Sequence, residues 1–238
     1  MTALASISDS DPICREIEFC GEQLVIDPSG CLYWPDEKLL VVSDLHFEKG
    51  NSIARKGRTF VPPYDTSATL ERLRAVAEFW NPRTIVSLGD SFHDEEVAKN
   101  LSASHQRTLT KIMDGREWVW IYGNHDPKLP DHLDGVHSNH LQIGNLNFVH
   151  EPRMDYLSGE IAGHLHPAAK IKQRGKSIRR RCVIGNDTRL ILPAFGQFTG
   201  GLNAKNAAFN ELFNPAKVQI WMLSQNNVFE ISARQLVK

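Results

Sequence analysis

Residues 39–46 read Leu-Leu-Val-Val-Ser-Asp-Leu-His, an apolar run that ends in a polar cluster. Four consecutive aliphatic residues are typical of a strand that is buried on both faces of a sheet. The same pattern recurs twice: residues 84–88 lead into Gly89-Asp90, and residues 118–122 lead into Gly123-Asn124-His125-Asp126. Each polar cluster is therefore expected at the carboxyl end of a buried strand.

Helical patterns separate these strands. The spacing of apolar residues predicts one helix over residues 64–80, capped by Asp65 or Thr66, and a second over residues 95–113. Beyond residue 130 the chain consists of short strand-like runs joined by turns. Alternating strands and helices in the first half, followed by mainly antiparallel strands, predict an α/β protein with two sheets face to face and helices outside.

The composition excludes several classes of protein. The 238 residues are 41% hydrophobic, enough for one large core, and we expect a single domain over residues 14–238 after a disordered lead-in at residues 1–13. Lys and Arg total 27 against 28 Asp and Glu, which excludes a globally basic nucleic-acid coat. No apolar run approaches the roughly 20 residues that span a bilayer. The polar start and four cysteines without C-x-x-C spacing predict a cytoplasmic protein with reduced thiols and no membrane partner.

Two more polar clusters follow strand-like runs in the second half, at His150 and at residues 163–167. Ligands of α/β proteins collect at the carboxyl ends of strands, so we expect all five clusters to face one crevice. Asp, Asn and imidazole without thiolate suit Mn²⁺, Fe or Zn²⁺. Seven ligands would crowd one ion but fit two ions about 3.5–4 Å apart that share a carboxylate. The candidate ligands are Asp44, His46, Asp90, Asn124, His150, His164 and His166.

Each motif taken alone has an ordinary explanation. Asp44 could cap a helix, and Asp90 could simply form a turn. All five motifs in this order, each after a strand, favour a metal centre instead. Asp126 leaves two alternatives open, because it could orient His125 or cap its own loop. The remaining histidines lack ligand spacing and are expected to be ordinary surface or loop residues; they are His105, His132, His137 and His140.

This order of motifs resembles the calcineurin-like metallophosphoesterase superfamily, whose pattern is Asp-x-His, Gly-Asp, Gly-Asn-His, a lone His and Gly-His-x-His. The resemblance runs from about residue 20 to residue 202. It implies a four-layer α/β/β/α sandwich of two mixed sheets and a pair of divalent cations. The first cation would be bound by Asp44, His46, Asp90 and His166, and the second by Asp90, Asn124, His150 and His164. Asp90 would bridge them, and His125 would sit over the phosphorus without binding metal.

Within the superfamily the chain is similar to a ligase-associated bacterial clade, PdeM, over residues 46–50, 54–57, 62–66, 89–94 and 192–202. That likeness implies Mn²⁺ as the metal, DNA as the substrate, and a role in DNA repair alongside proteins such as a DNA ligase and a helicase. One departure concerns His93, because phosphoprotein phosphatases of the superfamily carry Asp at that position. It argues against a protein phosphatase, and His93 is expected to contact substrate or to hold a metal ligand.

Residues 170–181 contain seven Lys and Arg and no acidic residue. Since this segment directly follows the last ligand motif, we interpret it as a phosphate-tracking patch, with Lys170, Lys172 and Arg174 contacting the substrate. The alternative is the exposed face of an edge strand, where basic residues discourage aggregation. A second basic cluster follows the first motif and comprises Lys49, Arg55, Lys56 and Arg58.

These motifs together predict a metal-dependent phosphodiesterase, and the resemblance implies a DNA endonuclease of DNA repair. It would cleave by in-line attack of a hydroxide that bridges the two metals, while His125 assists the leaving group. A phosphomonoesterase or nucleotidase is the alternative, because the same centre cleaves either ester. A metal-free scaffold protein is disfavoured, since all seven ligand positions are present.

Overall fold

The computed structural model describes residues 12–50, 64–93, 101–131, 133–155 and 158–238. Its first sheet has seven strands, antiparallel from β1 to β4 and parallel from β4 to β7. In sheet order these are β1 (Arg15–Phe19), β2 (Glu22–Ile26), β3 (Leu32–Trp34), β4 (Leu39–Val42), β5 (Thr84–Leu88), β6 (Glu117–Ile121) and β7 (Val136–Ser138).

The second sheet has nine strands and is mainly antiparallel, although β10 pairs in parallel with both of its neighbours. Its main path is β14 (Leu202–Asn203), β11 (Pro167–Gln173), β12 (Lys176–Gly185), β13 (Arg189–Ile191), β10 (Glu160–Ala162), β9 (Leu146–Val149) and β8 (His140–Ile143). Off this path, β15 (Gln219–Leu223) pairs with β12, and β16 (Val228–Ile231) pairs with β15.

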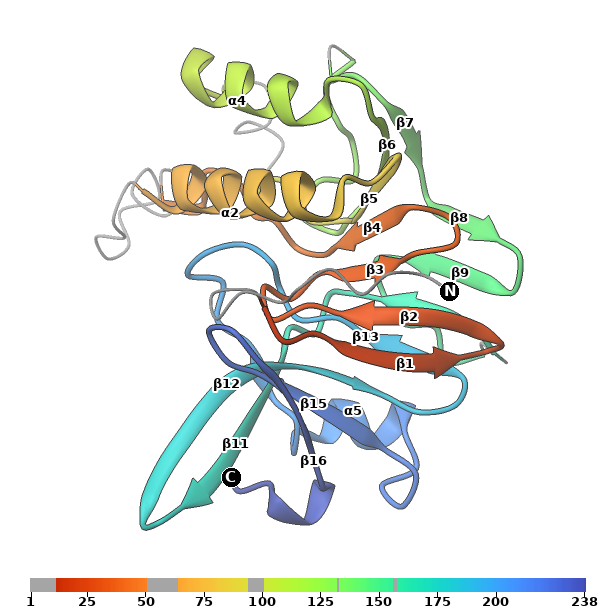
Figure 1. Cartoon of the computed structure of the whole chain (residues 1–238), viewed down its shortest axis with the longest axis vertical. Coiled ribbons are helices and arrows are strands. Elements are labelled where there is room, and N and C mark those ends of the chain that lie inside the picture. Colours follow the sequence, from red (N-terminus) through yellow and green to blue (C-terminus); the bar gives the residue numbers. More distant parts are fainter. Residues whose placement is uncertain (1–11, 51–63, 94–100, 132, 156–157) are drawn as a thin grey trace, which may run out of the picture.

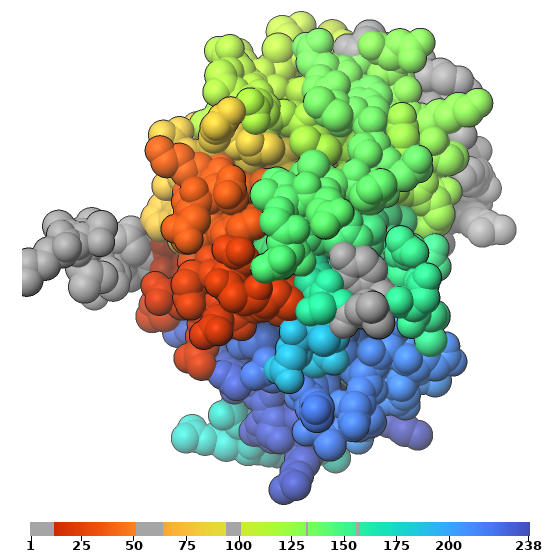
Figure 2. Space-filling model, turned by 90° about the vertical axis from the view of Figure 1, so that its right-hand side faces the viewer, coloured from red at the N-terminus to blue at the C-terminus, as the bar shows by residue number. Residues whose placement is uncertain are grey.

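The sheets lie face to face, and helices cover their outer surfaces (Figure 1). Helices α2 (Asp65–Trp80) and α4 (Ala103–Met113) lie over the first sheet, while the short helix α5 (Ala207–Leu212) and the 3₁₀ helix η1 (Ala233–Gln235) lie against the second. In the space-filling view the helix layer of the first sheet and the C-terminal segment form opposite ends of the molecule (Figure 2). The predicted α/β/β/α arrangement is confirmed, with a thin fourth layer.

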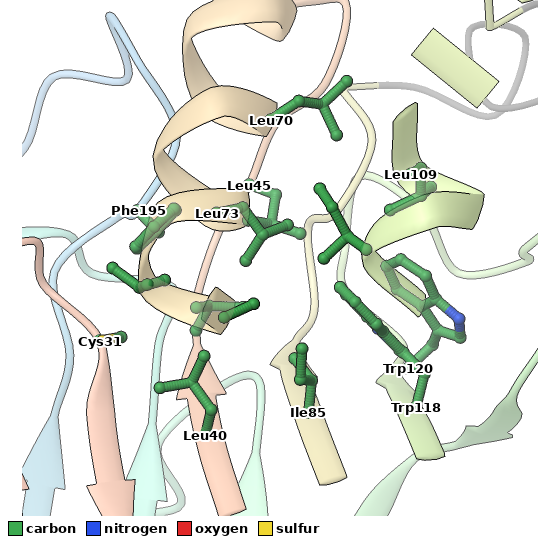
Figure 3. Close-up of a cluster of buried hydrophobic side chains, with 14 of the residues drawn as sticks. Cys31, Leu40, Leu45, Leu70, Leu73, Ile85, Leu109, Trp118, Trp120 and Phe195 are labelled. Atoms are coloured by element: carbon green, nitrogen blue, oxygen red, sulfur yellow. The ribbon is translucent and has the colours of Figure 1, made fainter. Parts of the chain in front are cut away.

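Three apolar clusters hold these layers together. The central cluster joins the facing sides of the sheets and includes Ile26, Val86 and Phe148. A second lies between α2, α4 and the first sheet, where Leu73 and Trp120 are fully buried (Figure 3). The third lies under α5. Since both faces of the central strands are covered, continuous apolar runs such as β4 are explained.

Two details of the predicted helices are wrong. Neither Asp65 nor Thr66 caps α2; the Thr66 hydroxyl accepts a hydrogen bond from the Glu48 backbone at 2.6 Å, and the Asp65 carboxylate accepts one from Gly50 at 2.7 Å. These side chains tie the start of α2 to the loop after β4. In the part of the second predicted helix that the structure describes, α4 begins only at Ala103, because the Ser102 side chain accepts a hydrogen bond from His105 and caps it. Residues 95–100 lie outside the described residues.

The start of the described chain is joined to the second sheet. Of the predicted lead-in, residues 1–11 lie outside the described residues, whereas Ile13 forms a bridge with Asn227. The four cysteines, at positions 14, 20, 31 and 182, are free. None of the described helices has both the length and the apolar character that crossing a bilayer would demand.

The parallel strands determine where the polar clusters lie. β4, β5 and β6 pair in parallel register, so the loops that follow them leave the first sheet at one edge. In the second sheet β9 and β10 are also parallel, which places His150 and the segment after Ala162 at a common edge. All five clusters predicted to converge follow these strand ends.

Replacing Leu73 with Ala should lower the free energy of unfolding by about 2–5 kcal/mol, because the side chain is fully buried between α2 and the first sheet. Glu71→Ala, an exposed position on the same helix, is the matched control and should change stability by less than about 0.5 kcal/mol. Chemical denaturation measures both. Equal effects of the two substitutions would contradict this packing.

Candidate metal centre

Backbone hydrogen bonds hold the ligand-bearing loops together. The His46 amide donates to the Asp90 carbonyl at 2.9 Å, and the Phe47 amide donates to the Ser91 carbonyl at 2.9 Å, so the loops after β4 and β5 run side by side. Across the sheets, the Phe195 amide donates to the Ser43 carbonyl at 2.7 Å. The edges of the two sheets are thereby fastened at the site.

The first group of side chains comprises Asp44, His46 and His166. One ligand-type atom from each lies within 4.8 Å of those from the other two. The Asp44 Oδ1 to His166 Nε2 distance is 3.0 Å, and the His46 and His166 Nε2 atoms are 3.4 Å apart. Asp44 and His46 are buried, and His166 is partly buried.

The second group comprises Asp90, His150 and His164, again with one atom of each within 4.8 Å of the others. His150 Nε2 lies 3.4 Å from Asp90 Oδ1, 3.2 Å from His164 Nδ1 and 3.0 Å from Asn124 Oδ1. The structure therefore brings together all seven side chains that the sequence singled out.

Asp90 lies between the two groups. Its Oδ1 faces His150 in the second group, and its Oδ2 lies 3.9 Å from His46 Nε2 in the first. A carboxylate whose two oxygens face different sets of ligands has the arrangement that a shared ligand of two cations requires.

The donor chemistry of both groups fits cations. His150 Nδ1 donates to the Leu88 carbonyl at 2.9 Å, so in the neutral ring the unprotonated Nε2 faces acceptor atoms of Asn124 and Asp90. In the first group, the buried Asp44 Oδ1 accepts no hydrogen bond among the described residues. Facing acceptors without a proton between them repel, and a cation between them removes that repulsion.

Protonation states favour the same conclusion. Burial lowers the pKa of His46 to about 2, so its ring is neutral and offers a lone pair near pH 7. For Asp44, burial opposes ionisation, but the neighbouring imidazoles, His166 foremost, outweigh it and hold its pKa well below the usual value. The first group thus contains an ionised Asp44 and a neutral His46.

The ligand-bearing backbone is strained. Asp44, His46, Asp90, His164 and His166 all adopt positive φ, between 45° and 67°. Such conformations cost non-glycine residues on the order of 1–3 kcal/mol each and persist where the surroundings over-determine them. Five such residues in one ligand set indicate that the positions required of the ligand side chains, and not the local backbone preference of each residue, determine the shape of these loops.

Glycines before two motifs permit the close approach of the loops. A Cβ built on Gly123 would lie 2.2 Å from both the backbone nitrogen and Oδ1 of Asp90, and one on Gly163 would lie 1.9 Å from Ser43 Oγ. Neither position has room for a methyl group. Neither glycine has a positive φ, so the close approach of the neighbouring loop, and not a special backbone conformation, is the reason for glycine at these two positions.

Asp126 caps its loop and does not orient His125. Its Oδ1 accepts hydrogen bonds from the backbone of Asp90 and Gly123, and its Oδ2 accepts one from Phe92, each at 3.0 Å. Of the two roles that the sequence left open, the structure therefore supports the loop cap. Its buried carboxylate fixes the backbone that carries Asp90.

His125 lies at the mouth of the site, outside both groups, with 42% of its side chain exposed. Its Nδ1 donates to the His93 carbonyl at 3.0 Å, its ring stacks on the His93 ring, and its Nε2 lies 4.0 Å from Asp90 Oδ2. His93 also packs edge-on against His46, with ring centroids 5.6 Å apart. His93 therefore holds His125 through its backbone and contacts the first group through its ring.

The predicted substrate contacts lie on the hairpin of β11 and β12, which projects from the second sheet (Figure 1). At about 3.3 Å per residue, Lys170 lies ~13 Å and Lys172 ~20 Å along the strand from His166. Arg174 lies in the exposed turn between the two strands. The hairpin thus begins at the centre and leads away from it. Arg55, Lys56 and Arg58 lie outside the described residues.

His105 has a role that sequence reasoning missed. Its Nδ1 lies 2.7 Å from the buried Glu48 Oε1, and its Nε2 lies 2.9 Å from the Ser67 hydroxyl. It therefore connects α4 and α2 to the loop that follows His46. No local motif signals this contact, because the partners are 38 and 57 residues away. His132 lies outside the described residues.

Two sheets that carry paired His/Asp groups at one edge define a metal-dependent phosphoesterase with a binuclear centre. The chain belongs to the calcineurin-like phosphoesterase family, whose family model matches residues 37–197. That range contains all seven candidate ligands and His125.

Among solved structures, the fold is similar to the crystal structure of the Pseudomonas putida nuclease MPE, with a TM-score of 0.69 and 24% sequence identity. The match covers 92% of this chain and 100% of that one. No curated protein sequence matches the chain. At this identity the likeness establishes a shared fold.

Replacing Gly123 with Ala should reduce the content of both cations, because the new methyl group would displace Asp90, which faces both groups. Gly144→Ala is the control: its φ of +55° makes the substitution strained, but the added Cβ meets nothing within 4 Å. Metal analysis after dialysis against Mn²⁺ measures the difference. Full occupancy in the Gly123 variant would show that the close approach to Asp90 is not needed.

Proposed function

We propose that this phosphoesterase is a phosphodiesterase that cleaves DNA internally, an Mn²⁺-dependent endonuclease of DNA repair in the cytoplasm. The observation that carries the proposal is the Asp90 carboxylate between two His/Asp groups, with the partly exposed His125 beside it. The likeness to the PdeM clade supports the repair role, and partners such as a DNA ligase and a helicase. The structural neighbour described as a nuclease supports a nucleic-acid substrate.

The proposed ligand sets follow the two groups. Asp44, His46, Asp90 and His166 would hold one cation, and Asp90, Asn124, His150 and His164 the other. When bound, such a pair neutralises phosphoryl oxygens and lowers the pKa of a water molecule. The protein contributes the fixed geometry: buried carboxylates, neutral imidazoles and a backbone that holds each side chain in place.

His125 is proposed to donate a proton to the departing oxygen. Because its Nδ1 is committed to the His93 carbonyl, its Nε2 is the nitrogen that faces the site. A protonated Nε2 can deliver its proton as the ester bond breaks, which is general-acid catalysis. His93 positions His125 and lies near enough to the first group to contact the substrate, the role expected for it.

A long substrate is favoured over a small ester by the basic hairpin. Lys170 and Lys172 lie about 13 and 20 Å along β11 from His166, and Arg174 follows in the turn, so these basic residues extend much further than a mononucleotide reaches. Positive charge at this spacing suits successive phosphates of a nucleic-acid backbone.

Replacing His125 with Ala should lower turnover about 10²–10⁴-fold while leaving two equivalents of metal bound. The loss should be larger on DNA, whose leaving alkoxide is strongly basic, than on bis(4-nitrophenyl) phosphate, whose leaving group needs little protonation. His140→Ala, at an exposed position in β8, is the matched histidine control and should behave as wild type. Parallel loss of metal and turnover would make His125 a ligand instead.

With Mn²⁺ the protein should hydrolyse bis(4-nitrophenyl) phosphate faster than 4-nitrophenyl phosphate, and should nick circular DNA. A circular substrate has no ends, so nicking requires internal cleavage. Single-stranded and duplex circles, assayed by gel electrophoresis, also define the preferred strandedness. A faster reaction with the monoester, and intact circles, would favour the phosphomonoesterase or nucleotidase alternative.

A further inference from the structure

A cavity lies next to the metal centre, and the loop of residues 196–201 separates the two. It has a volume of about 480 Å³ and is lined by four arginines, from α2 and β12, and by residues 196–200. The arginines are Arg72, Arg179, Arg180 and Arg181. No acidic residue contributes to this lining within the part of the chain that the structure describes.

Two of these guanidinium groups are largely buried without a counter-charge. Arg72 lies over the Phe195 ring at 4.6 Å and donates to the Phe195 carbonyl, while Arg181 donates to the Ala194 carbonyl at 2.9 Å. Arg72 Nε is buried and makes no hydrogen bond with any described residue. Burial, and secondarily Arg181, lower the pKa of Arg72 to about 9, which reflects mainly the cost of removing its guanidinium group from water.

An acidic group that lines an adjoining cavity is already engaged in other hydrogen bonds. Asp27 lines a neighbouring cavity together with Arg72 and Arg181, but its carboxylate accepts hydrogen bonds from Ser29 at 2.7 Å and from the Trp80 indole at 3.0 Å. The ion pairs among the described residues include neither of these arginines. Arginines that are partly removed from water and lack a counter-charge suit the cavity to an anion from outside the chain.

An exposed aromatic side chain lines the same cavity. Phe198 is 53% exposed and has a φ of +57°, a conformation that a bulky residue seldom adopts. The Phe198 ring therefore offers a surface on which a base can stack, and the neighbouring arginines offer a site for its phosphate.

The wall between this cavity and the metal centre is shared. The Gly196 amide donates to the Asp44 carbonyl at 3.0 Å, and a Cβ on Gly201 would lie 2.3 Å from the His166 carbonyl. The loop that lines the cavity therefore packs against the backbone of two residues of the first group, Asp44 and His166. Ala168, which also lines the cavity, is only two residues from His166, so the cavity and the centre are neighbours in the fold.

We propose that the cavity binds the nucleotide that neighbours the scissile phosphate in a nucleic-acid strand, with its phosphate on Arg72, Arg179 and Arg181 and its base stacked on Phe198. This inference rests on the proposed nuclease function and specifies where that function holds its substrate. It adds contacts from α2 and the loop of residues 196–201 to those expected on the hairpin.

The test measures the binding of a fluorescent single-stranded dodecanucleotide by anisotropy in EDTA, where cleavage does not interfere. Phe198→Ala should weaken binding about tenfold, and Phe198→Trp should restore it, because stacking needs only an aromatic face. Arg179→Ala should lower the slope of log affinity against log salt concentration by about 0.7, the value for one lost phosphate contact on a single strand. Both side chains are exposed, and thermal unfolding verifies that the variants fold.

Matched controls are Phe229→Ala and Arg234→Ala, exposed residues of β16 and η1 far along the chain from the loop. They should bind as wild type does. Unchanged affinity in the Phe198 and Arg179 variants, or failure of the wild type to bind at 50 mM salt, would overturn the inference. Inorganic phosphate that binds as tightly as the dodecanucleotide would also overturn it, since the cavity would then be a free-anion site.

The proposed function is tested separately by wild-type hydrolysis of bis(4-nitrophenyl) phosphate with Mn²⁺. Hydrolysis together with unaltered oligonucleotide binding in the variants would refute the cavity assignment alone. Absence of hydrolysis would refute the phosphodiesterase.

Discussion

The structure depends on bringing hydrogen-bond acceptors together at the meeting edge of two sheets. Asp90 faces imidazole nitrogens on both sides, and in the neutral His150 ring the facing Nε2 carries no proton, because Nδ1 donates to the Leu88 carbonyl. Packing alone does not favour this arrangement, because partly buried acceptors repel one another. The convergence of these side chains explains two other features of the loops. It requires the positive φ of Asp44 and His164, and it brings the loops so close together that only glycine fits at the contact points.

The layers of the fold supply the rigidity that this convergence requires. The apolar core between the sheets fixes the strand ends, and backbone hydrogen bonds then join the loops to one another. Asp126 contributes by holding three amides around the Asp90 turn. A ligand set drawn from five loops keeps its geometry because few of those loops can move without breaking a hydrogen bond to the next.

Much of the fold and of the centre could be predicted from the sequence, because both depend on local patterns. Apolar runs marked β4, β5 and β6, and each ligand motif sits directly at the end of such a run. The contacts of Thr66 with Glu48, and of His105 with Glu48, could not be predicted, because these partners meet only after the chain has folded. The same applies to the arginine cavity, whose walls come from α2, β12 and the loop after β13. The seven basic residues between positions 170 and 181 were visible in the sequence, but it was not visible that Arg72 joins three of them, Arg179, Arg180 and Arg181.

The long strand β12 has a mechanical consequence. Residues 176–181 are mostly exposed in the hairpin, while residues 182–185 are buried in the second sheet, and the strand continues from one part to the other without interruption. The hairpin is therefore an arm whose base is anchored in the core, and this anchoring holds its direction relative to the metal centre. A partner molecule that lies along this arm therefore has to adapt its own shape to the arm, because the arm is held by the core.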